Sequence, residues 1–344
     1  MSLFEDKKIL LFAPRFFGYE KEISDNIQKK CKLCVFFDER ANPNTFEKIC
    51  IRLNFRNVIK RKINFYYQSI IDKFDASYFD YVIFLNPETI TFDLLKKMKE
   101  KQKKAVFVIY MWDSFENKLH TKELLPLFDK KLSFNKKDCD DYNLTFRPLF
   151  FIDKYDSDKT KNNNSTCDID LGFIGTIHSD RYKILKTIKN WAELSGLKTN
   201  YYMYFPSIIL YYKYKIENIR KQKLTKKDFH FCSLNSSEVF DYISNCKVII
   251  DIQHPKQVGL TMRTIEMLGL RKKLITTNDD IKNYDFYNED NICIINRDNV
   301  IIDKTFLVSK YNNITDSFRQ KYSIDSFTND LLYKDDKEMG YYQQ

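Results

Sequence analysis

The sequence predicts an α/β protein built on two mostly parallel sheets. Apolar runs with the length of buried strands, such as residues 8–13 and 81–85, alternate with segments of helical periodicity. A second alternating set begins at residue 169, and the chain of 344 residues is about twice as long as a typical domain. We therefore expect two domains of the same architecture.

The first domain is predicted to span residues 1–152. Its main strands and helices alternate along the chain and lie at residues 8–13, 19–30, 33–37, 81–85, 91–101 and 105–110. Short strands at 132–134 and 145–151 end this Rossmann-like domain. It lacks the G-x-G-x-x-G pattern of dinucleotide-binding proteins, which argues against NAD.

Residues 153–168 have no apolar periodicity and are rich in Asp, Asn, Lys and Thr, which indicates a linker. A second Rossmann-like domain is expected at residues 169–312, with its strands and helices at 169–174, 180–195, 199–204, 236–245, 247–251, 260–270 and 272–277. Gly269, near the end of the predicted helix at 260–270, fits a helix C-cap. The remaining segment, 313–344, contains an amphipathic stretch at 313–332 that predicts a terminal helix.

The most informative stretch is residues 259–278. Gly259, one of only seven glycines, stands between a predicted buried strand and a predicted helix. The first N–H groups of a helix lack internal partners and carry partial positive charge, so they favour a phosphate. Arg263 and Glu266 share one helical face, where a cation beside the phosphates and a carboxylate for the ribose hydroxyls would recognise a nucleoside diphosphate. The alternative is a surface ion pair and a simple turn.

The same stretch carries a resemblance to a known family. The run RTIEMLG at 263–269, followed by KLITTN at 273–278 and YDFYN at 284–288, resembles the C-terminal domain of GT-B glycosyltransferases. It is most similar to the CgeB-like and capsule or lipopolysaccharide biosynthesis branch, and it is specific over about 230–296. The resemblance implies two Rossmann-like domains facing across a cleft, a donor diphosphate on the helix after the glycine turn, and a terminal helix that crosses back to the N-terminal domain.

Further donor contacts are expected at neighbouring turns. Gly175 and Thr176 precede a helix that carries Arg181, which makes a second candidate phosphate contact, although a tight turn alone would explain the glycine. His178 beside it could bind phosphate or be solvated. The complete set of donor-binding candidates is Gly175, Thr176, Arg181, His254, Gly259, Leu260, Thr261, Arg263, Glu266 and Asn278.

Sugar transfer needs a stabilised leaving group, an acceptor held in line and usually a base. Candidate bases at strand ends or turns of the first domain are Asp113, Glu88 and Glu20, with Asp38 and Glu39 also considered. Asp113 is favoured because Trp112 beside it suits a sugar face. Each carboxylate could instead be a cap or a surface group. No D-x-D motif occurs at a strand end, so we expect no metal and no cofactor besides the nucleotide-sugar co-substrate.

The formal net charge of +10 suggests an anionic partner. Segments 52–71 and 204–227 combine an apolar face, cations and tyrosines, which suits an anionic membrane, although either could be a helix packed on its own domain. No signal-peptide pattern or membrane-spanning run occurs, and the eight scattered cysteines fit a reducing compartment. We expect a cytoplasmic protein that associates peripherally with the inner face of the plasma membrane.

Three functions follow from these observations. The first is a GT-B glycosyltransferase that moves a sugar from a nucleotide sugar to a growing, lipid-linked bacterial surface glycan. The second keeps the fold and changes the chemistry to a nucleotide-sugar epimerase or a polyol-phosphate transferase. A nucleic-acid-binding protein is favoured least, because no RNP-like or helix-turn-helix pattern appears.

Overall fold

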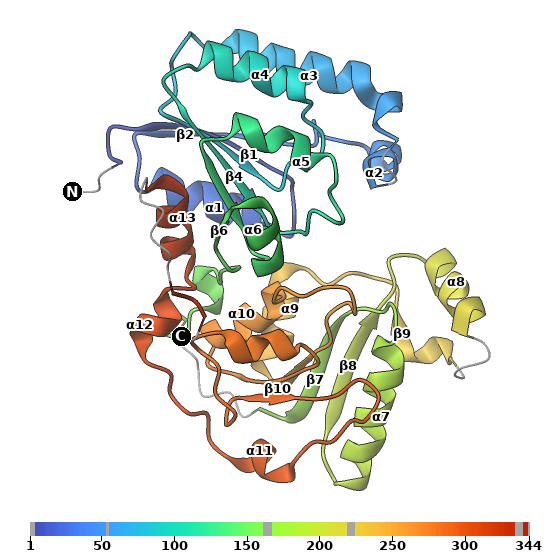
Figure 1. Cartoon of the computed structure of the whole chain (residues 1–344). Coiled ribbons are helices and arrows are strands. Elements are labelled where there is room, and N and C mark those ends of the chain that lie inside the picture. The colour runs from blue at the N-terminus through green and yellow to red at the C-terminus, as the bar shows by residue number, and fades with distance from the viewer. Residues whose placement is uncertain (1–3, 53–54, 161–166, 219–223, 334–339, 343–344) are drawn as a thin grey trace. The chain divides into compact units, whose positions relative to one another are not determined.

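The computed structural model describes residues 4–52, 55–160, 167–218, 224–333 and 340–342 (Figure 1). The chain divides into two compact units: unit 1 is Met1–Leu149 with Ile324–Tyr341, and unit 2 is Phe150–Ser323 with Tyr342–Gln344. Each unit holds one six-stranded sheet whose neighbouring strands all pair in parallel. The predicted α/β class with two Rossmann-like domains is confirmed.

Unit 1 begins with alternating strands and helices. Its elements up to the end of the sheet are β1 (Lys8–Ala13), α1 (Tyr19–Gln28), β2 (Leu33–Asp38), α2 (Thr45–Arg52), η1 (Arg56–Ile59), α3 (Lys60–Lys73), β3 (Tyr81–Leu85), α4 (Phe92–Lys101), β4 (Val106–Met111), α5 (Thr121–Leu124), η2 (Leu125–Leu127), β5 (Lys130–Ser133), α6 (Lys136–Tyr142) and β6 (Thr145–Phe146). Here η denotes a 3₁₀ helix. The strand order is β2-β1-β3-β4-β5-β6.

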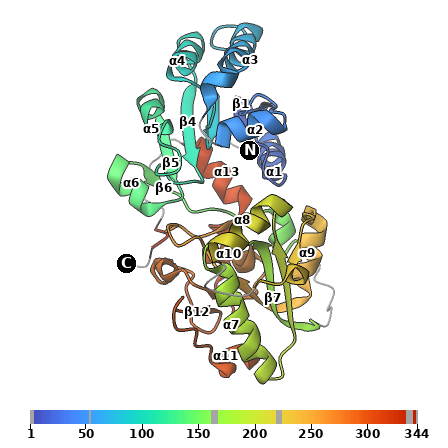
Figure 2. The same ribbon diagram turned by 90° about the vertical axis from the view of Figure 1, so that its right-hand side faces the viewer.

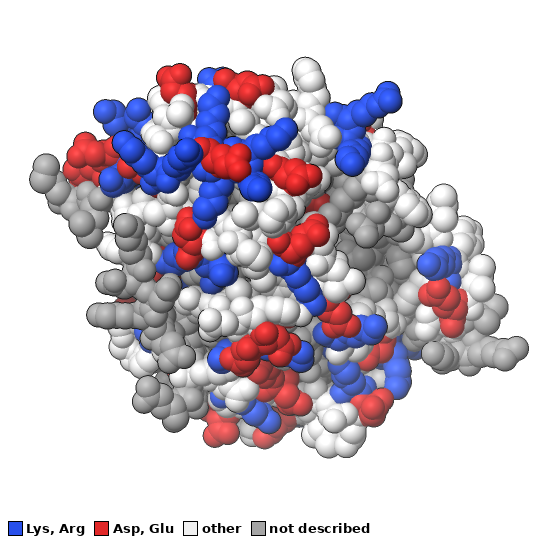
Figure 3. Space-filling model, turned by 45° about the horizontal axis from the view of Figure 1, so that its top comes forward, with Lys and Arg blue, Asp and Glu red and all other residues white. Residues whose placement is uncertain are grey.

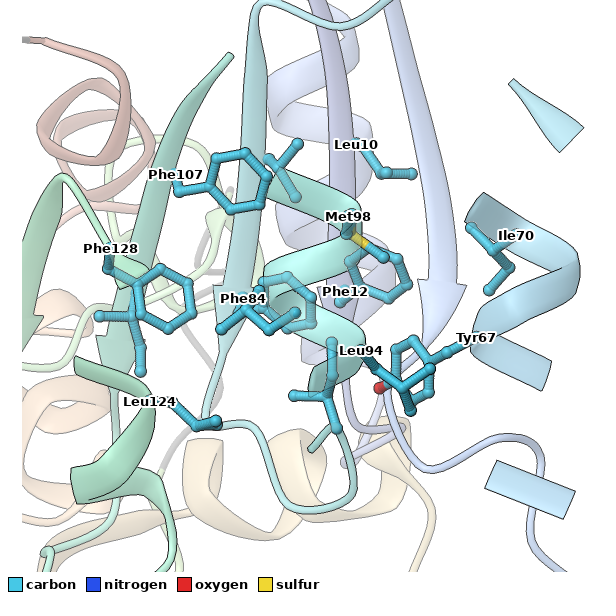
Figure 4. Close-up of a cluster of buried hydrophobic side chains, with 14 of the residues drawn as sticks. Leu10, Phe12, Tyr67, Ile70, Phe84, Leu94, Met98, Phe107, Leu124 and Phe128 are labelled. Atoms are coloured by element: carbon cyan, nitrogen blue, oxygen red, sulfur yellow. The ribbon is translucent and has the colours of Figure 1, made fainter. Parts of the chain in front are cut away.

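One face of this sheet packs against α3 and α4. Alternate side chains of the strands, such as Leu10, Phe12 and Phe84, join residues of these helices in one buried cluster (Figure 4). The rings of Phe12 and Phe84 are stacked with centroids 4.5 Å apart. Because helices cover both faces of the sheet, the strands are apolar throughout, which explains their clear signal in the sequence.

The opposite face is covered by α1 and by α13 (Ile324–Leu332), which lie side by side (Figures 1 and 2). Tyr110 of β4 packs edge-on against Phe327 of α13, with ring centroids 4.8 Å apart. The fully buried Arg147 Nε lies 2.6 Å from Asp330 Oδ2 of α13. Helix α13, the last helix in the described part of the chain, is therefore part of the core of unit 1.

Unit 2 repeats the architecture with different elements: η3 (Asp153–Tyr155), β7 (Ile169–Thr176), α7 (Arg181–Leu194), β8 (Thr199–Tyr204), α8 (Ile208–Asn218), η4 (Lys226–Asp228), β9 (Phe229–His230), α9 (Ser236–Ser244), β10 (Cys246–Asp251), α10 (Met262–Gly269), β11 (Lys273–Thr276), η5 (Asp279–Asn283), β12 (Ile292–Ile294), α11 (Lys304–Val308) and α12 (Asp316–Gln320). The strand order is β12-β11-β10-β7-β8-β9. Helices α7 and α11 contribute to a buried cluster on one face of the sheet, and α9 and α10 lie on the other (Figure 1).

Several elements differ from the sequence-based expectation. The stretch 313–332 is not one helix but two, α12 and α13, which belong to different units. Gly269 is not a C-cap residue: it is the last residue of α10, and a Cβ there would lie 2.3 Å from the Tyr155 carbonyl oxygen. Close packing against residues 151–155, and not a left-handed turn, requires this glycine.

The first part of the predicted linker forms regular structure. Asp153–Tyr155 forms η3, and the adjacent Asp156 is 1% exposed. Its Oδ1 accepts a 2.7 Å hydrogen bond from the buried Arg319 Nη1. Residues 161–166 lie outside the described part. Within the described residues, no helix has both the length and the apolar character needed to cross a bilayer.

Candidate functional site

Arg181 lies between β7 and β10, where the strand order in the sheet of unit 2 reverses. The chain runs from β7 outward to β8 on one side, while β10 begins the run toward β12 on the other. Open α/β sheets bind ligands at the carboxyl ends of their strands at such a switch point. Arg181 donates from Nε to the Ile252 carbonyl, just past β10, at 2.5 Å, and from Nη1 to the Thr176 carbonyl, at the end of β7, at 2.7 Å.

Three more basic side chains lie at the same edge. Arg297 follows β12 and donates from Nη2 to the Gln253 carbonyl at 2.6 Å and from Nη1 to Asp180 Oδ1 at 2.7 Å. The rings of His178 and His254 are 5.3 Å apart. We call His178, Arg181, His254 and Arg297 the basic cluster. Two guanidinium groups grouped with two imidazoles suit an anionic ligand.

The charges within the basic cluster act on one another. Burial, with the charge of nearby Arg181 and an interaction with His254, lowers the pKa of His178 to about 4. Burial also lowers the pKa of Arg181, and Arg297 adds to that effect, while Asp251 opposes it. A bound anion would relieve both electrostatic costs.

The N-terminus of α10 already faces a carboxylate. Thr261 caps the helix: its Oγ1 accepts a 3.2 Å hydrogen bond from Thr264 N and donates to Asp251 Oδ2. Thr264 Oγ1 also donates to Asp251 Oδ2, at 2.9 Å. A phosphate at this end of the helix would meet the charge of Asp251, which disfavours the N-terminus of α10 as an anion site.

Arg263 and Glu266 form an ion pair, as one expectation had it, but the pair is not on the surface. Arg263 Nη1 lies 2.7 Å from Glu266 Oε2, and the two side chains are 20% and 6% exposed. Buried Tyr155 lies close enough for both charges to affect the pKa of its hydroxyl, which burial chiefly raises. The pair is therefore part of a packed, charged region on α10.

The side chain of Asn278 fixes the turn before α10. Asn278 Nδ2 donates to the Val258 carbonyl at 3.0 Å and lies 3.5 Å from the Gly259 carbonyl oxygen. Asn278 and Leu260 are both buried, at 4% and 2% exposure. These contacts make Asn278 a clamp for the turn. The sequence suggested that both side chains contact the nucleotide. Their burial disfavours such direct contact.

Gly175 has little space around it. A Cβ at this position would lie 3.2 Å from the Phe173 ring and 3.6 Å from Arg181 Nη1. The tight contact is with the Phe173 ring, whereas the distance to the Arg181 guanidinium is an ordinary van der Waals contact. A groove of about 850 Å³ opens between α7 and α8 and reaches this edge, where its lining includes Ser179, Asp180 and Pro255.

In unit 1, Glu88 is locked in place by two cations. It accepts from Arg40 Nε at 2.7 Å, Arg40 Nη2 at 3.0 Å and Lys118 Nζ at 2.6 Å. Burial alone would raise the pKa of Glu88, but the Arg40 hydrogen bond and the charges of Lys118 and Arg40 lower it. These contacts disfavour Glu88 as a catalytic base.

Asp113 and Glu20 have different surroundings. Asp113 Oδ1 accepts from Ser114 N and Asn117 Nδ2, both at 2.9 Å, whereas its Oδ2 lies 3.9 Å from Lys118 Nζ, beyond hydrogen-bonding distance. Glu20 Oε2 accepts from Phe16 N at 3.0 Å, which fixes the loop before α1. Asp113 thus keeps one carboxylate oxygen for another partner, whereas Glu20 has a local structural task.

Glu39, which directly follows β2, is a buried carboxylate that the sequence did not favour as the base. Glu39 is fully buried, and its Oε1 accepts from Thr89 N at 2.6 Å and Ile90 N at 3.2 Å. Its Oε2 has no hydrogen-bond partner among the described residues. Burial and the charge of Glu88 raise the pKa of Glu39 to about 7.

Comparison with known proteins defines the class of fold. No protein-family model and no curated protein sequence matches this chain. Its two parallel six-stranded α/β units match the GT-B fold.

Three solved structures show this similarity. HepE from Anabaena in complex with UDP-glucose has a TM-score of 0.57 at 9% identity, over 94% of this chain and 98% of that one. OtsA in its apo form has a TM-score of 0.59 at 11% identity, over 95% and 99%. A putative UDP-N-acetylglucosamine 2-epimerase from Listeria monocytogenes has a TM-score of 0.53 at 8% identity, over 95% of both chains.

Proposed function

We propose that this protein is a glycosyltransferase that uses a nucleotide sugar. The observation that carries the proposal is the basic cluster, with Arg181 joining the ends of β7 and β10 at the switch point of unit 2. A GT-B structure in complex with UDP-glucose shows that a protein of this fold can hold a nucleotide sugar.

The proposed roles follow from the contacts. Arg181, Arg297, His178 and His254 stabilise the negative charge that builds on the diphosphate as the glycosidic bond to it breaks. Glu266, held by Arg263, accepts hydrogen bonds from the ribose hydroxyls. Asp113 takes the proton of the acceptor hydroxyl as that oxygen bonds to the sugar carbon. Transfer without a metal stays part of the proposal, and unchanged turnover in a chelator tests it.

A binding screen tests the donor site. We expect UDP-, GDP-, CDP- or dTDP-linked sugars to raise the melting temperature of the wild-type protein, and the same sugar to act weakly on Arg181→Ala. Lys189→Ala, an exposed cation on α7, is the matched control. Absence of a response to every nucleotide sugar would refute the donor site.

A nucleotide-sugar 2-epimerase is the second candidate, because a putative enzyme of that name shares the fold. An epimerase converts the sugar without an acceptor, whereas a transferase releases nucleoside diphosphate in proportion to an added acceptor. Incubation with the bound nucleotide sugar, with and without acceptor lipid extract, separates the two. A preference for CDP-polyols would instead favour a polyol-phosphate transferase.

The acceptor is proposed to be a lipid-linked surface glycan, met at a membrane. Helix α8 supports this: Tyr211 and Tyr214 are buried, whereas Ile209 and Ile216 are 75% and 70% exposed, with lysines in the same helix. Residues 219–223 of the predicted segment 204–227 lie outside the described part. Sedimentation with phosphatidylglycerol vesicles tests the idea, and the double variant I209D/I216D should abolish binding.

The net charge does not by itself favour nucleic acid. On the face shown in Figure 3, Lys and Arg side chains lie beside Asp and Glu side chains in many places, so charges of both signs are mixed there. Nucleic-acid binding, the function favoured least, would depend steeply on salt and require no nucleotide sugar.

A further inference from the structure

A cluster of aromatic side chains lies at the carboxyl edge of the sheet of unit 1. Phe16 and Phe17 come from the loop between β1 and α1, and Trp112 follows β4. The ring centroids of Phe16 and Phe17 are 4.7 Å apart, and those of Phe16 and Trp112 are 6.2 Å apart. We call these three residues the aromatic platform.

The platform stands at the switch point of its sheet. From β1 the chain goes to β2 on one side, while β3 and β4 lie on the other, so the direction changes between β1 and β3. The contact of Phe16 with Trp112 joins the loops that follow β1 and β4, and it therefore crosses the end of β3. This is the position at which open α/β sheets bind ligands.

The loop between β1 and α1 exposes two aromatic rings and has an unfavourable backbone conformation at Phe17. Phe17 is 73% exposed and has a φ of 52°, and Phe16 is 42% exposed. A positive φ strains a residue that carries a Cβ, and such strain gathers at binding sites. Gly18, with a φ of 85°, and the hydrogen bond from Phe16 N to Glu20 hold the loop in this shape.

Charged groups flank the rings. Arg15, with a side chain 68% exposed, has its Nε 3.6 Å from Asp38 Oδ2. Asp113 directly follows Trp112 and leaves Oδ2 without a close donor, as described above. Aromatic faces take the C–H face of a pyranose ring, and carboxylates and a guanidinium take its hydroxyls.

A buried polar residue lies at the same edge. Asn86 follows β3 directly, has a left-handed φ of 47°, which asparagine tolerates, and is 2% exposed. Its Oδ1 is buried without a hydrogen-bond partner among the described residues. Because buried acceptors without a partner are rare, this one marks the end of β3 as a functional edge.

We propose that the aromatic platform binds a pyranose ring of the acceptor, which stacks on the more exposed Phe17 ring and contacts the nearly perpendicular Phe16 ring beside it, with its hydroxyls toward Asp113 and Arg15. The proposal deepens the glycosyltransferase function proposed above and rests on it for the role of the sugar as acceptor. It commits the acceptor to a glycan: any lipid carried by the acceptor is recognised elsewhere.

Tryptophan fluorescence provides a direct test. The chain has two tryptophans, and Trp191→Phe in unit 2 leaves Trp112 as the only one. Cellobiose, maltose and diacetylchitobiose serve as probes. We expect at least one of them to change the Trp112 emission saturably, and Phe16→Ala or Phe17→Ala in that background to weaken the apparent affinity about fivefold, as loss of a stacked ring predicts. Phe65→Ala, which removes a 78% exposed ring on α3, is the matched control and should have no effect.

Three outcomes would overturn the proposal. The first is no saturable change with any disaccharide, and the second is an affinity that Phe16→Ala and Phe17→Ala leave unchanged. The third is vesicle binding lost in those variants while the disaccharides have no effect, which would make the platform a membrane contact. The melting-temperature response to nucleotide sugars is measured separately. Its absence beside an intact disaccharide response would refute the transferase and leave the sugar site standing.

Discussion

Arg263 and Glu266 are joined by a 2.7 Å ion pair within α10, and the carboxylate is 6% exposed. Breaking such a pair leaves a partly buried charge unbalanced, so each partner depends on the other. The pair also fixes the orientation of Glu266, which recognition of a pair of ribose hydroxyls requires.

Glu266→Gln should weaken binding of the nucleoside diphosphate. Gln preserves the shape but lacks the charge that strengthens hydrogen bonds to ribose, so we expect a loss of about 1.5–3 kcal/mol, or roughly tenfold to a hundredfold in affinity. Isothermal titration calorimetry measures it. Glu193→Gln, an exposed carboxylate on α7, is the control. Equal affinities for wild type and Glu266→Gln would remove Glu266 from the site.

Thr261→Ala should destabilise unit 2. The hydroxyl caps α10 and also donates to Asp251, so its loss costs about 2 kcal/mol, whereas Thr261→Ser keeps both bonds and should cost far less. Denaturant unfolding followed through Trp191 in a Trp112→Phe background reports on unit 2. Equal losses for the Ala and Ser variants would show that packing of the methyl group, and not the cap, matters.

Glu39 should make unit 1 less stable as the pH rises. Its pKa is raised from 4.5 to about 7, so the folded protein retains a proton that the unfolded chain releases first. Stability therefore falls between these two values and is constant above them, with a total loss of about 3 kcal/mol. Relative to wild type, Glu39→Gln should gain that amount between about pH 4.5 and pH 8, read from Trp112 in a Trp191→Phe background. The exposed control Glu100→Gln should show no such gain. If the unfolding free energy of Glu39→Gln varied with pH in the same way as that of the wild type, the prediction would be contradicted.

Donor binding should take up a proton at His178. The pKa of this imidazole is lowered to about 4, so it is neutral in the empty protein at about pH 6, and the charge of a neighbouring diphosphate favours the imidazolium. Calorimetry with a UDP-sugar, whose diphosphate stays ionised in this range, should give different heats in buffers with different ionisation enthalpies. His178→Asn should abolish the difference. Identical heats for the wild-type protein would place the diphosphate away from His178.

Asp113→Asn should lower kcat at least a hundredfold if Asp113 accepts the proton, with little change in donor affinity. Glu88→Gln should instead weaken the ion pairs to Arg40 and Lys118 and lower the melting temperature, with a smaller effect on kcat. Steady-state rates and melting curves of both variants decide between the two carboxylates. A larger kcat loss in Glu88→Gln would reverse the assignment.

The sequence predicted the long buried strands well because helices cover both faces of each sheet. Strands such as β1 and β3 are therefore continuously apolar, and they could be placed within a residue or two. The short strands β9 and β12 contain only two and three residues, too few for a periodic signal. Arg297 was missed for this reason, since its place at the sheet edge depends on β12.

The site residues were predicted from the order of strands, turns and helices along the sequence. Tertiary contacts then changed the roles assigned to some of them. Arg181 was correctly expected near the end of β7, but its bond to the Ile252 carbonyl depends on strands far apart in the sequence. Asn278 and Gly269 fit a ligand contact and a helix cap in the sequence alone. Their tasks, holding the turn at Gly259 and admitting the Tyr155 carbonyl, became visible only through packing.

The membership of α13 in unit 1 has a consequence for biosynthesis. Residues 150–323 leave the ribosome before α13, so unit 2 has all of its main sequence while unit 1 still lacks a helix. Until α13 has been synthesised, Arg147 has no Asp330 to pair with and Tyr110 has no Phe327 beside it. A nascent chain that stops short of residue 324 therefore has an incomplete core in unit 1, the unit whose sequence is synthesised first.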